Sequence, residues 1–322
     1  MPLLEINDLY VSYALSRDRK VQAVKGVSVA VERGESVGLV GESGCGKSTL
    51  ASAVMRLVPA GRGVISYNGV NVLGLRGKGL FKFRGKMQMV FQDPYGSLNP
   101  RLSVGSALEE CLAVHGICSR VERSGRVGEL LQTVGLERSH AARYPHEFSG
   151  GQRQRIGIAR ALAVNPEFII ADEPVSALDV SIQAQILNLL KDLQEKKKFS
   201  FLFIAHDLAV VRYMCARIYV MYLGAIMETG ATDDVYLRPA HPYTRVLLDA
   251  VPDIDRALAG RRSKRAALEG EMPSLSAHIG GCPFHPRCPL AKPICRAEVP
   301  ETKKVAAGHF SRCHFAGEIQ SL

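Results

Sequence analysis

The stretch from Gly41 to Ser48, GESGCGKS, combines residue types and a spacing that can bind phosphate. It matches the pattern G-x-x-x-x-G-K-[ST], in which glycines let consecutive backbone N–H groups turn toward one anion. Lys47 adds a mobile positive charge for the β- and γ-phosphates, and the Ser48 hydroxyl is an oxygen ligand of the kind that Mg²⁺ prefers. We therefore expect a nucleoside triphosphate site formed by Gly41, Glu42, Ser43, Gly44, Cys45, Gly46, Lys47, Ser48 and Thr49.

Two neighbouring carboxylates, Asp172 and Glu173, end the apolar run FIIADEP and supply groups that hydrolysis requires. At the end of a buried strand, the carboxylate of Asp172 can hold Mg²⁺ through water. Glu173 points elsewhere and can orient and deprotonate the attacking water. An Asp-Glu pair after a strand is by itself more often a surface turn. Together with a phosphate-binding loop, it predicts an enzyme that hydrolyses a nucleoside triphosphate.

Four of the eight cysteines lie in the C-terminal tail, and they form the second group of residues with possible chemistry. They lack the closely spaced pairs that are usual in structural zinc sites. Four thiolates with variable spacing can hold a 4Fe–4S cluster, which would stabilise a short segment of low apolar content. Zinc and unligated thiols are the alternatives, and His285 or His314 could replace a thiolate. The cysteines are Cys282, Cys288, Cys295 and Cys313.

The segments that must position these residues alternate between strand and helix patterns. The apolar run SVGLV leads directly into the glycine loop and a helical pattern over 49–58 follows, so the loop lies between a strand and a helix N-terminus. Such alternation predicts an α/β core with a mainly parallel sheet. The predicted strands are 3–13, 27–40 with a break at a Glu-Arg-Gly turn, 167–172, 199–207 and 217–230. The other predicted helices are 104–114, 126–136, 181–198 and 208–216.

The composition of the 322 residues, 47% hydrophobic and 22% charged, is that of a soluble globular protein. The net charge of +10 includes a basic run over 256–265 without interleaved aromatic residues, so we expect a solvated segment and no nucleic-acid partner. The apolar runs fall far short of the roughly 20 residues of a membrane span. The N-terminus has no basic signal region, and we expect a cytoplasmic protein with reduced thiols.

The run FSGGQRQRIGIARAL, 148–162, resembles the signature motif of ATP-binding cassette (ABC) ATPases. Further motifs stand in family order, namely Gln92 of VFQDP, Asp179 of SALD and His206 of FIAHD. The resemblance implies an α/β P-loop NTPase fold of the ABC type. It also implies a nucleotide-binding domain over 1–238 with a helical subdomain over about 93–165, and a small cysteine-containing extension over 239–322.

The resemblance also implies roles for single residues. Gln92 contacts the metal and the water, His206 contacts the γ-phosphate, and Asp179 acts across a dimer interface. Tyr13 is the candidate for stacking on adenine, with Tyr10 as the alternative and a core-strand role for either equally open. Mg²⁺ is bound through Ser48, Gln92 and Asp172. The signature residues close over ATP held by a second subunit, and they are Ser149, Gly150, Gly151 and Gln152.

Longer runs, among them VFQDPYGSLNPR, ADEPVSALDVSIQAQILNLL and HPYT (241–244), look like ATPase subunits of bacterial oligopeptide and dipeptide ABC importers. GGQRQRIGIARAL looks more like the F-type member of the paired D and F subunits. This implies a heterodimer with a D-type ATPase at the cytoplasmic face of the membrane, two permeases and an extracytoplasmic binding protein. Importers for nickel, glutathione or murein peptides share these motifs, and a soluble ABC ATPase or an ATP-binding scaffold is a further alternative. Some dipeptide-importer ATPases carry a 4Fe–4S cluster on a segment similar to GCPFHPRCP.

Overall fold

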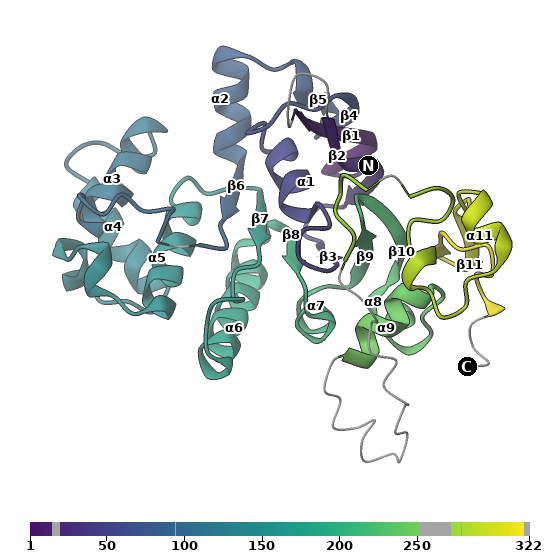
Figure 1. Cartoon of the computed structure of the whole chain (residues 1–322). Helices are drawn as coiled ribbons and strands as arrows, with labels where there is room; N and C mark the ends of the chain where they lie inside the picture. The colour runs from purple at the N-terminus through teal and green to yellow at the C-terminus, as the bar shows by residue number, and fades with distance from the viewer. Residues whose placement is uncertain (15–19, 94, 251–271, 278, 319–322) are drawn as a thin grey trace. The chain divides into compact units, whose positions relative to one another are not determined.

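The computed structural model describes residues 1–14, 20–93, 95–250, 272–277 and 279–318. The predicted solvated run over 256–265 lies outside these residues. The chain divides into two compact units, drawn with their element labels in Figure 1. The first unit comprises Met1–Val31, Ser36–Leu73 and Ala205–Leu322, and the second comprises Glu32–Glu35 and Gly74–Ile204.

The N-terminal part of the first unit is an antiparallel sheet with strand order β2-β1-β4-β5. Its strands are β1 (Leu4–Ala14), β2 (Lys20–Val31), β4 (Arg62–Tyr67) and β5 (Val70–Asn71). Along β1 the buried positions run Leu4, Ile6, Leu9, so the strict alternation shifts by one residue. The pairing register shifts at the same place, where Asp8 has a φ of 47°. This bulge keeps one face of β1 apolar on both sides of the irregularity.

A second sheet of the first unit carries the glycine loop. Strand β3 pairs in parallel with β9, and helix α7 (Leu208–Met214) covers β3 so closely that a Cβ on Gly38 would lie 2.2 Å from Val211. The loop follows β3 and leads into α1 (Lys47–Val54). The strand order is β11-β12-β10-β9-β3, with β3 (Ser36–Val40), β9 (Arg217–Tyr222), β10 (Ala225–Ala231), β11 (Lys303–Ala306) and β12 (His309–Ser311).

The single strand expected over 217–230 is wrong, because β9 and β10 form a hairpin around Leu223 and Gly224. Both turn residues have positive φ, 45° and 87°. A two-residue turn of this kind matches the twist of the flanking strands. Leu223 is an unusual residue there, which explains why the apolar run did not indicate a turn.

The C-terminal segment adds strands to this sheet beside β10, as Figure 1 shows for the yellow part of the chain. Helices α8 (Thr232–Leu237) and α9 (Pro242–Ala250) follow β10, and α11 (Pro293–Ala297) precedes β11. The backbone of Glu228 in β10 is opposite Ser311 in β12. The division of the chain at residue 239 stays a prediction.

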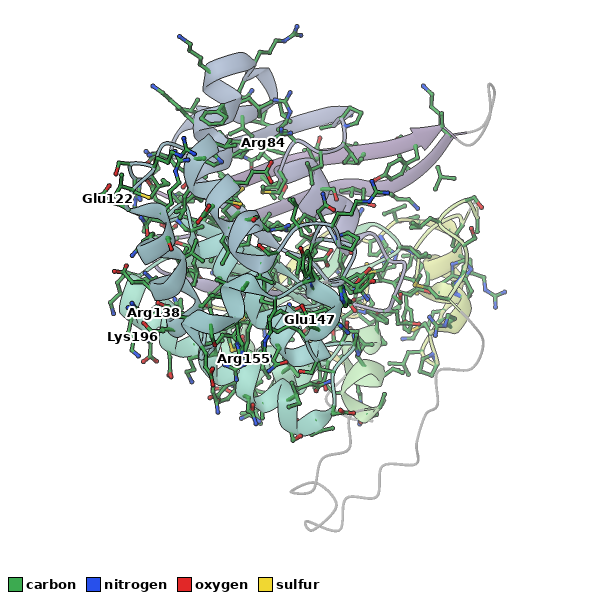
Figure 2. The ribbon with its side chains drawn as sticks, turned by 90° about the vertical axis from the view of Figure 1, so that its left-hand side faces the viewer. Arg84, Glu122, Arg138, Glu147, Arg155 and Lys196 are labelled. Atoms are coloured by element: carbon green, nitrogen blue, oxygen red, sulfur yellow. The ribbon has the colours of Figure 1, made fainter. Side chains whose placement is uncertain are left out.

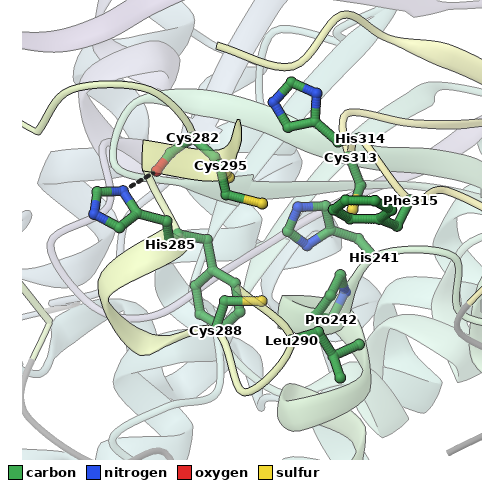
Figure 3. Close-up of a pocket in the computed structure, with 11 residues that line it drawn as sticks. His241, Pro242, Cys282, His285, Cys288, Leu290, Cys295, Cys313, His314 and Phe315 are labelled. Carbon is green, nitrogen blue, oxygen red and sulfur yellow. Dashed lines mark hydrogen bonds between the residues drawn. The ribbon is translucent and has the colours of Figure 1, made fainter. Parts of the chain in front are cut away.

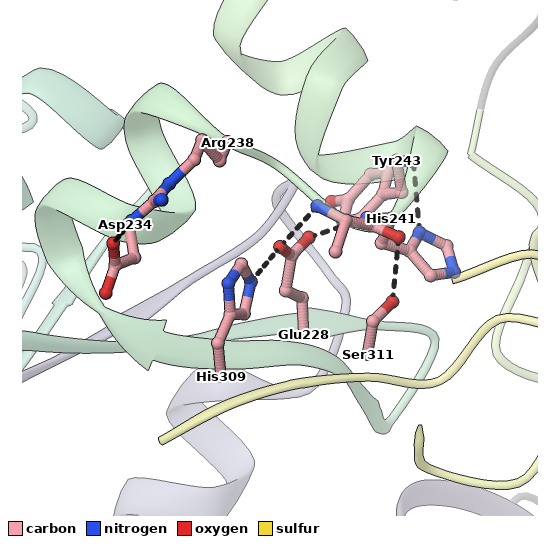
Figure 4. Close-up of polar contacts among 8 residues, drawn as sticks. Glu228, Asp234, Arg238, His241, Tyr243, His309 and Ser311 are labelled. Carbon is pink, nitrogen blue, oxygen red and sulfur yellow. Dashed lines mark hydrogen bonds and ion pairs between the residues drawn. The ribbon is translucent and has the colours of Figure 1, made fainter. Parts of the chain in front are cut away.

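A buried carboxylate joins the C-terminal strand to the turn before α9 (Figure 4). Glu228 accepts hydrogen bonds from the backbone N–H groups of Ala240 and His241 at 2.7 and 2.9 Å. Its Oε1 also lies 2.7 Å from His309 Nε2, and both side chains are almost fully buried. Ser311 donates to the Ala240 carbonyl at 3.0 Å. These bonds fix where α9 begins relative to β10 and β12.

The second unit contains a parallel sheet with order β8-β7-β6, formed by β6 (Met87–Val90), β7 (Phe168–Asp172) and β8 (Ser200–Ala205). All residues of β7 and β8 are buried, which is typical of parallel strands covered on both faces. Helix α6 (Val180–Lys197) agrees with its predicted range to within one residue. Helix α2 (Gly77–Lys86) and strands β4, β5 and β6 have no counterpart among the predicted elements.

The rest of the second unit is helical, and Figure 2 views it with Arg138, Glu147 and Arg155 labelled. The helix predicted over 104–114 is confirmed, and apolar residues on one side of each helix form the core of this part. Arg155 donates to the Val134 carbonyl at 2.7 Å and so ties two helices together. The elements are α3 (Val104–Val114), α4 (Arg123–Thr133), α5 (Gly150–Leu162) and 3₁₀ turns at Arg138–Ala142 and Pro145–Glu147.

No helix within the described ranges is both long and apolar enough to cross a membrane.

Glu228→Gln is expected to lower the free energy of unfolding by about 1–3 kcal/mol, because one carboxylate oxygen becomes an NH₂ group facing a buried donor. Urea denaturation followed by circular dichroism measures the change. The control is Glu301→Gln in the same C-terminal segment, where the side chain is exposed and the change should stay within about 0.5 kcal/mol. Equal unfolding midpoints for the two variants would contradict the role of Glu228.

Candidate functional site

The glycine loop has the geometry of a phosphate-binding loop in the first unit. Lys47 is only 3% exposed, and its Nζ donates to the carbonyls of Gly41 and Glu42 at 2.8 and 3.0 Å. The ammonium group therefore lies inside the curve of its own loop, where it adds to the positive potential of the α1 N-terminus. Ser48, the next residue, is exposed at the first turn of α1.

Two glycines of the loop are required by close backbone contacts. Gly46 has a φ of 111°, and a Cβ there would lie 2.3 Å from the Ala23 carbonyl oxygen. A Cβ on Gly41 would lie 2.1 Å from the carbonyl oxygen of Met221. The curve that gathers the N–H groups is thus possible only without side chains at these two positions. Cys45 is fully buried, and burial raises the pKa of its thiol, in agreement with a space-filling role.

The two candidate adenine-stacking residues differ in their surroundings. Tyr13 is 39% exposed near the end of β1, and its hydroxyl lies 3.4 Å from Thr49 Oγ1 in α1. Tyr10 already has the guanidinium of Arg62 over its ring, 5.1 Å from the centroid. The ring of Tyr13 is therefore near the loop and accessible, whereas a face of Tyr10 is covered.

In the second unit the structure brings Gln92 and Glu173 together. The Gln92 amide donates to Glu173 Oε2 at 3.3 Å, and Asp172, 5% exposed, occupies the last position of β7. Glu173 has a φ of 45°, which is uncommon for a residue with a side chain. Such a conformation costs of order 1–3 kcal/mol and persists where surrounding contacts hold it. Here the Glu173 N–H donates to the Ile204 carbonyl at 2.9 Å.

The signature residues form the start of α5 in the second unit. Ser149 is the N-cap, its hydroxyl accepts from the Gln152 N–H, and the Gln152 side chain accepts from the Ser149 N–H at 3.0 Å. A Cβ on Gly151 would lie 2.5 Å from Ile182 in α6, so glycine is needed for close packing there. Ser149 and, at the start of α6, Asp179 are both exposed.

His206 lies in the first unit, directly after β8, and is exposed. The following residue, Asp207, caps α7 by accepting from the Ala209 N–H at 2.7 Å. The cap ends the strand and starts the helix within two residues, which places His206 at the carboxyl end of a parallel strand.

Two residues that the sequence pattern did not identify hold the glycine loop from the C-terminal segment. The Tyr243 hydroxyl accepts a hydrogen bond from the Glu42 N–H at 2.9 Å. Arg287 lies 3.0 Å from each oxygen of the Glu42 carboxylate. Both contacts connect positions more than 200 residues apart in sequence, so no local pattern could indicate them.

The four tail cysteines line one pocket in the first unit (Figure 3). Cys282, Cys295 and Cys313 are buried and Cys288 is half-buried. The Cys282 N–H donates to the Cys295 carbonyl at 2.8 Å, so two distant cysteines share one hydrogen-bonded backbone pair. Among the described residues, no group of three or more His, Cys, Asp or Glu side chains is arranged to hold a metal ion.

Burial raises the pKa of Cys288 and of Cys313 to about 11, although backbone hydrogen bonds oppose the shift. The neighbouring thiols add to it, because one thiolate would repel another. At neutral pH these two cysteines are therefore protonated, although the charge of Lys303 favours the thiolate of Cys313. The candidate ligands His285 and His314 each place a ring nitrogen against a backbone carbonyl, of Cys282 and Glu298.

His241 also lines this pocket, and its side chain is fully buried. Its Nδ1 accepts from the Tyr243 N–H at 3.0 Å, so in the neutral ring the proton is on Nε2. Burial lowers the pKa of His241 to about 3, against the opposing effect of the Arg312 backbone. Within the described residues, Nε2 makes no well-aligned hydrogen bond, and the Arg312 backbone is the group that favours a proton on this ring.

Two family models match the chain. One, described as ABC transporter, matches residues 24–176, and the other, described as oligopeptide/dipeptide transporter, C-terminal region, matches residues 227–295. The second match includes Tyr243, Arg287 and three of the four pocket cysteines.

Comparison with known proteins indicates the same family. The chain is 52% identical over 295 residues to the oligopeptide transport ATP-binding protein AppF of Bacillus subtilis, which covers 91% of this chain and 89% of AppF. It is 50% identical over 315 residues to the oligopeptide transport ATP-binding protein YkfD of the same species, covering 98% and 95%. A solved dimeric structure of the ATP-binding cassette MJ0796 with ADP and Pi has a TM-score of 0.63 and 31% identity, over 71% of this chain and 98% of that one. The expected ABC fold is confirmed, and the chain belongs to the family of ATP-binding subunits of oligopeptide-type ABC importers.

Proposed function

We propose that this chain hydrolyses ATP to power the import of dipeptides and oligopeptides through partner permeases. The observation that carries the proposal is the loop from Gly41 to Ser48, with Lys47 held inside its curve and glycines where side chains cannot fit. The relatives named for oligopeptide transport support the peptide cargo, since they align with almost the whole chain.

Each predicted site residue has its own role in this proposal. Backbone N–H groups of the loop and Lys47 would bind the phosphates, and Tyr13 would stack on adenine. Ser48, Gln92 and Asp172 would hold Mg²⁺. Bound Mg²⁺ neutralises charge on the β- and γ-phosphates. Glu173 takes the proton of the attacking water, and the Gln92 amide, 3.3 Å from it, orients its carboxylate and the water. His206 contacts the γ-phosphate.

The exposure of the signature serine and of Asp179 supports a second ATPase subunit as partner. The Ser149–Gln152 start of α5 would then face the nucleotide of that subunit, with its N-terminal N–H groups toward the γ-phosphate. We propose a heterodimer in which this chain is the F-type member and a D-type chain is the other. The solved relative MJ0796 is dimeric with bound ADP and Pi.

Two permeases and, indirectly, an extracytoplasmic binding protein complete the proposed complex, and this chain lies at the cytoplasmic face of the membrane. The loop over 95–105 in the helical part is the proposed contact with the permeases. Nickel, glutathione or murein-peptide import is the alternative cargo assignment. A soluble ABC ATPase outside transport is a weaker one, because the chain matches the oligopeptide transporter C-terminal model.

Glu173→Gln is expected to lower the rate of ATP hydrolysis by about 10²–10⁴-fold and to leave ATP binding intact, because the amide cannot accept the proton. Phosphate release from the purified transporter complex measures the rate. Glu195→Gln, an exposed change in α6 of the same unit, is the matched control and should retain full activity. Residual hydrolysis above one-tenth of wild type in Glu173→Gln would contradict the assigned base.

Transport itself is tested by recovery of partners and by uptake. A tagged chain solubilised in mild detergent should bring down polytopic membrane proteins, and cells carrying Glu173→Gln should lose uptake of a labelled tripeptide. Normal tripeptide uptake combined with loss of nickel or glutathione uptake would replace the peptide assignment by one of the alternatives. Recovery of the chain without any membrane protein would contradict a role in transport.

We further propose that the four-cysteine pocket holds a 4Fe–4S cluster that stabilises the C-terminal segment. Zinc is the alternative occupant, and it would bind its thiolates at about 2.3 Å. A cluster binds each thiolate through a different iron, which suits four cysteines spread around one pocket.

Protein purified without oxygen is expected to contain about four iron atoms per chain and to absorb broadly at about 400 nm. Cys288→Ser should lose both, whereas Cys118→Ser in the second unit should keep them. One zinc ion per chain would favour the zinc alternative, and metal-free protein with normal folding would favour unligated thiols.

A further inference from the structure

Glu42 is part of the phosphate-binding loop, and it contacts both Arg287 and Tyr243. Arg287 lies 3.0 Å from both oxygens of the Glu42 carboxylate, and the Glu42 N–H donates to the Tyr243 hydroxyl. The Arg287 side chain is 6% exposed and that of Glu42 is 22% exposed. Glu42 is therefore fixed at its backbone and at its side chain by the C-terminal segment.

A carboxylate beside a phosphate site is unfavourable unless its charge is neutralised. ATP carries several negative charges, and the interaction of like charges is stronger where water is partly excluded. The guanidinium of Arg287 compensates the Glu42 charge and fixes the carboxylate, since both carboxylate oxygens face one guanidinium nitrogen.

The position of Arg287 depends on the cysteine segment. It is the last residue of a 3₁₀ turn, His285–Arg287, and precedes Cys288 directly. The Arg287 N–H donates to the Phe284 carbonyl at 3.0 Å, and the Phe284 ring packs on Tyr222 and Tyr243 with centroid distances of 5.3 Å to each. The same turn therefore presents Cys288 to the pocket and Arg287 to the loop.

We propose that Arg287 is a positioning residue for ATP binding, which neutralises Glu42 and makes the affinity of the loop for polyphosphate depend on the folded cysteine segment. The inference rests on the proposed function of the loop in binding ATP. It does not require a particular occupant of the cysteine pocket, because the contact is made by the protein alone.

The test is a titration of the full chain with a fluorescent ATP analogue and, in competition, with ATP and adenosine. Arg287→Gln is expected to weaken ATP binding on the order of tenfold and to change adenosine binding by less than about twofold, since only the phosphates meet the Glu42 charge. In the Glu42→Gln background, Arg287→Gln should have almost no further effect. Arg287→Lys should restore part of the affinity.

Arg296→Gln is the matched control, because Arg296 is exposed in α11 of the same segment and should leave ATP affinity unchanged. The proposal would be overturned if Arg287→Gln weakened ATP and adenosine binding equally, or if it weakened ATP binding equally with Glu42 and with Gln at position 42. An equal loss of ATP binding in Arg296→Gln would also overturn it. Cys288→Ser is expected to weaken ATP binding in the wild-type background but not in Arg287→Gln. Additive losses would overturn the dependence on the cysteine segment.

Iron analysis of the same samples separates this inference from the proposed function. If the wild type binds ATP and contains no iron, the cluster assignment fails while the Arg287 titrations still decide the inference. If the wild type binds no ATP at all, the proposed function fails first. An Arg287→Gln variant with normal iron content and weakened ATP binding supports a direct effect on the loop.

Discussion

The buried carboxylate of Glu228 fixes the part of the chain on which both functional regions depend. A carboxylate without donors in a protein interior is strongly disfavoured, and this one has three, from Ala240, His241 and His309. These donors come from the turn before α9 and from β12, so the turn and the C-terminal strand have one favourable position relative to β10. That position also places Tyr243, whose hydroxyl contacts the glycine loop, and His241, which lines the cysteine pocket.

The shape of the glycine loop depends on neighbouring strands as well as on its own sequence. The carbonyls of Ala23 in β2 and Met221 in β9 occupy the space that side chains at Gly46 and Gly41 would need. The Gly224 N–H in the β9–β10 turn donates to the Cys45 carbonyl at 2.8 Å. The β9–β10 hairpin is therefore a wall of the phosphate site, and its tight turn is a condition for the loop geometry.

The sequence was sufficient to predict the features that depend on local pattern. The loop between a strand and a helix, the helix 104–114 and the family itself could all be predicted, because glycine spacing, apolar periodicity and ordered motifs are properties of short segments. The tight turn at Leu223 could not, since leucine rarely adopts a positive φ. The contact of Arg287 with Glu42 could not either, because it joins residues 245 positions apart. The cysteines were identified by type, but their common pocket and the presence of His241 in it required the fold.

The left-handed backbone of Glu173 has a consequence for how this enzyme can change. Glycine would adopt a φ of 45° without the cost that a side chain brings, so the position favours a residue that cannot perform proton transfer. Selection for stability alone would move the sequence away from glutamate here, and only selection for turnover retains it. In duplicated ABC subunits released from the need to hydrolyse ATP, this position is where drift should begin.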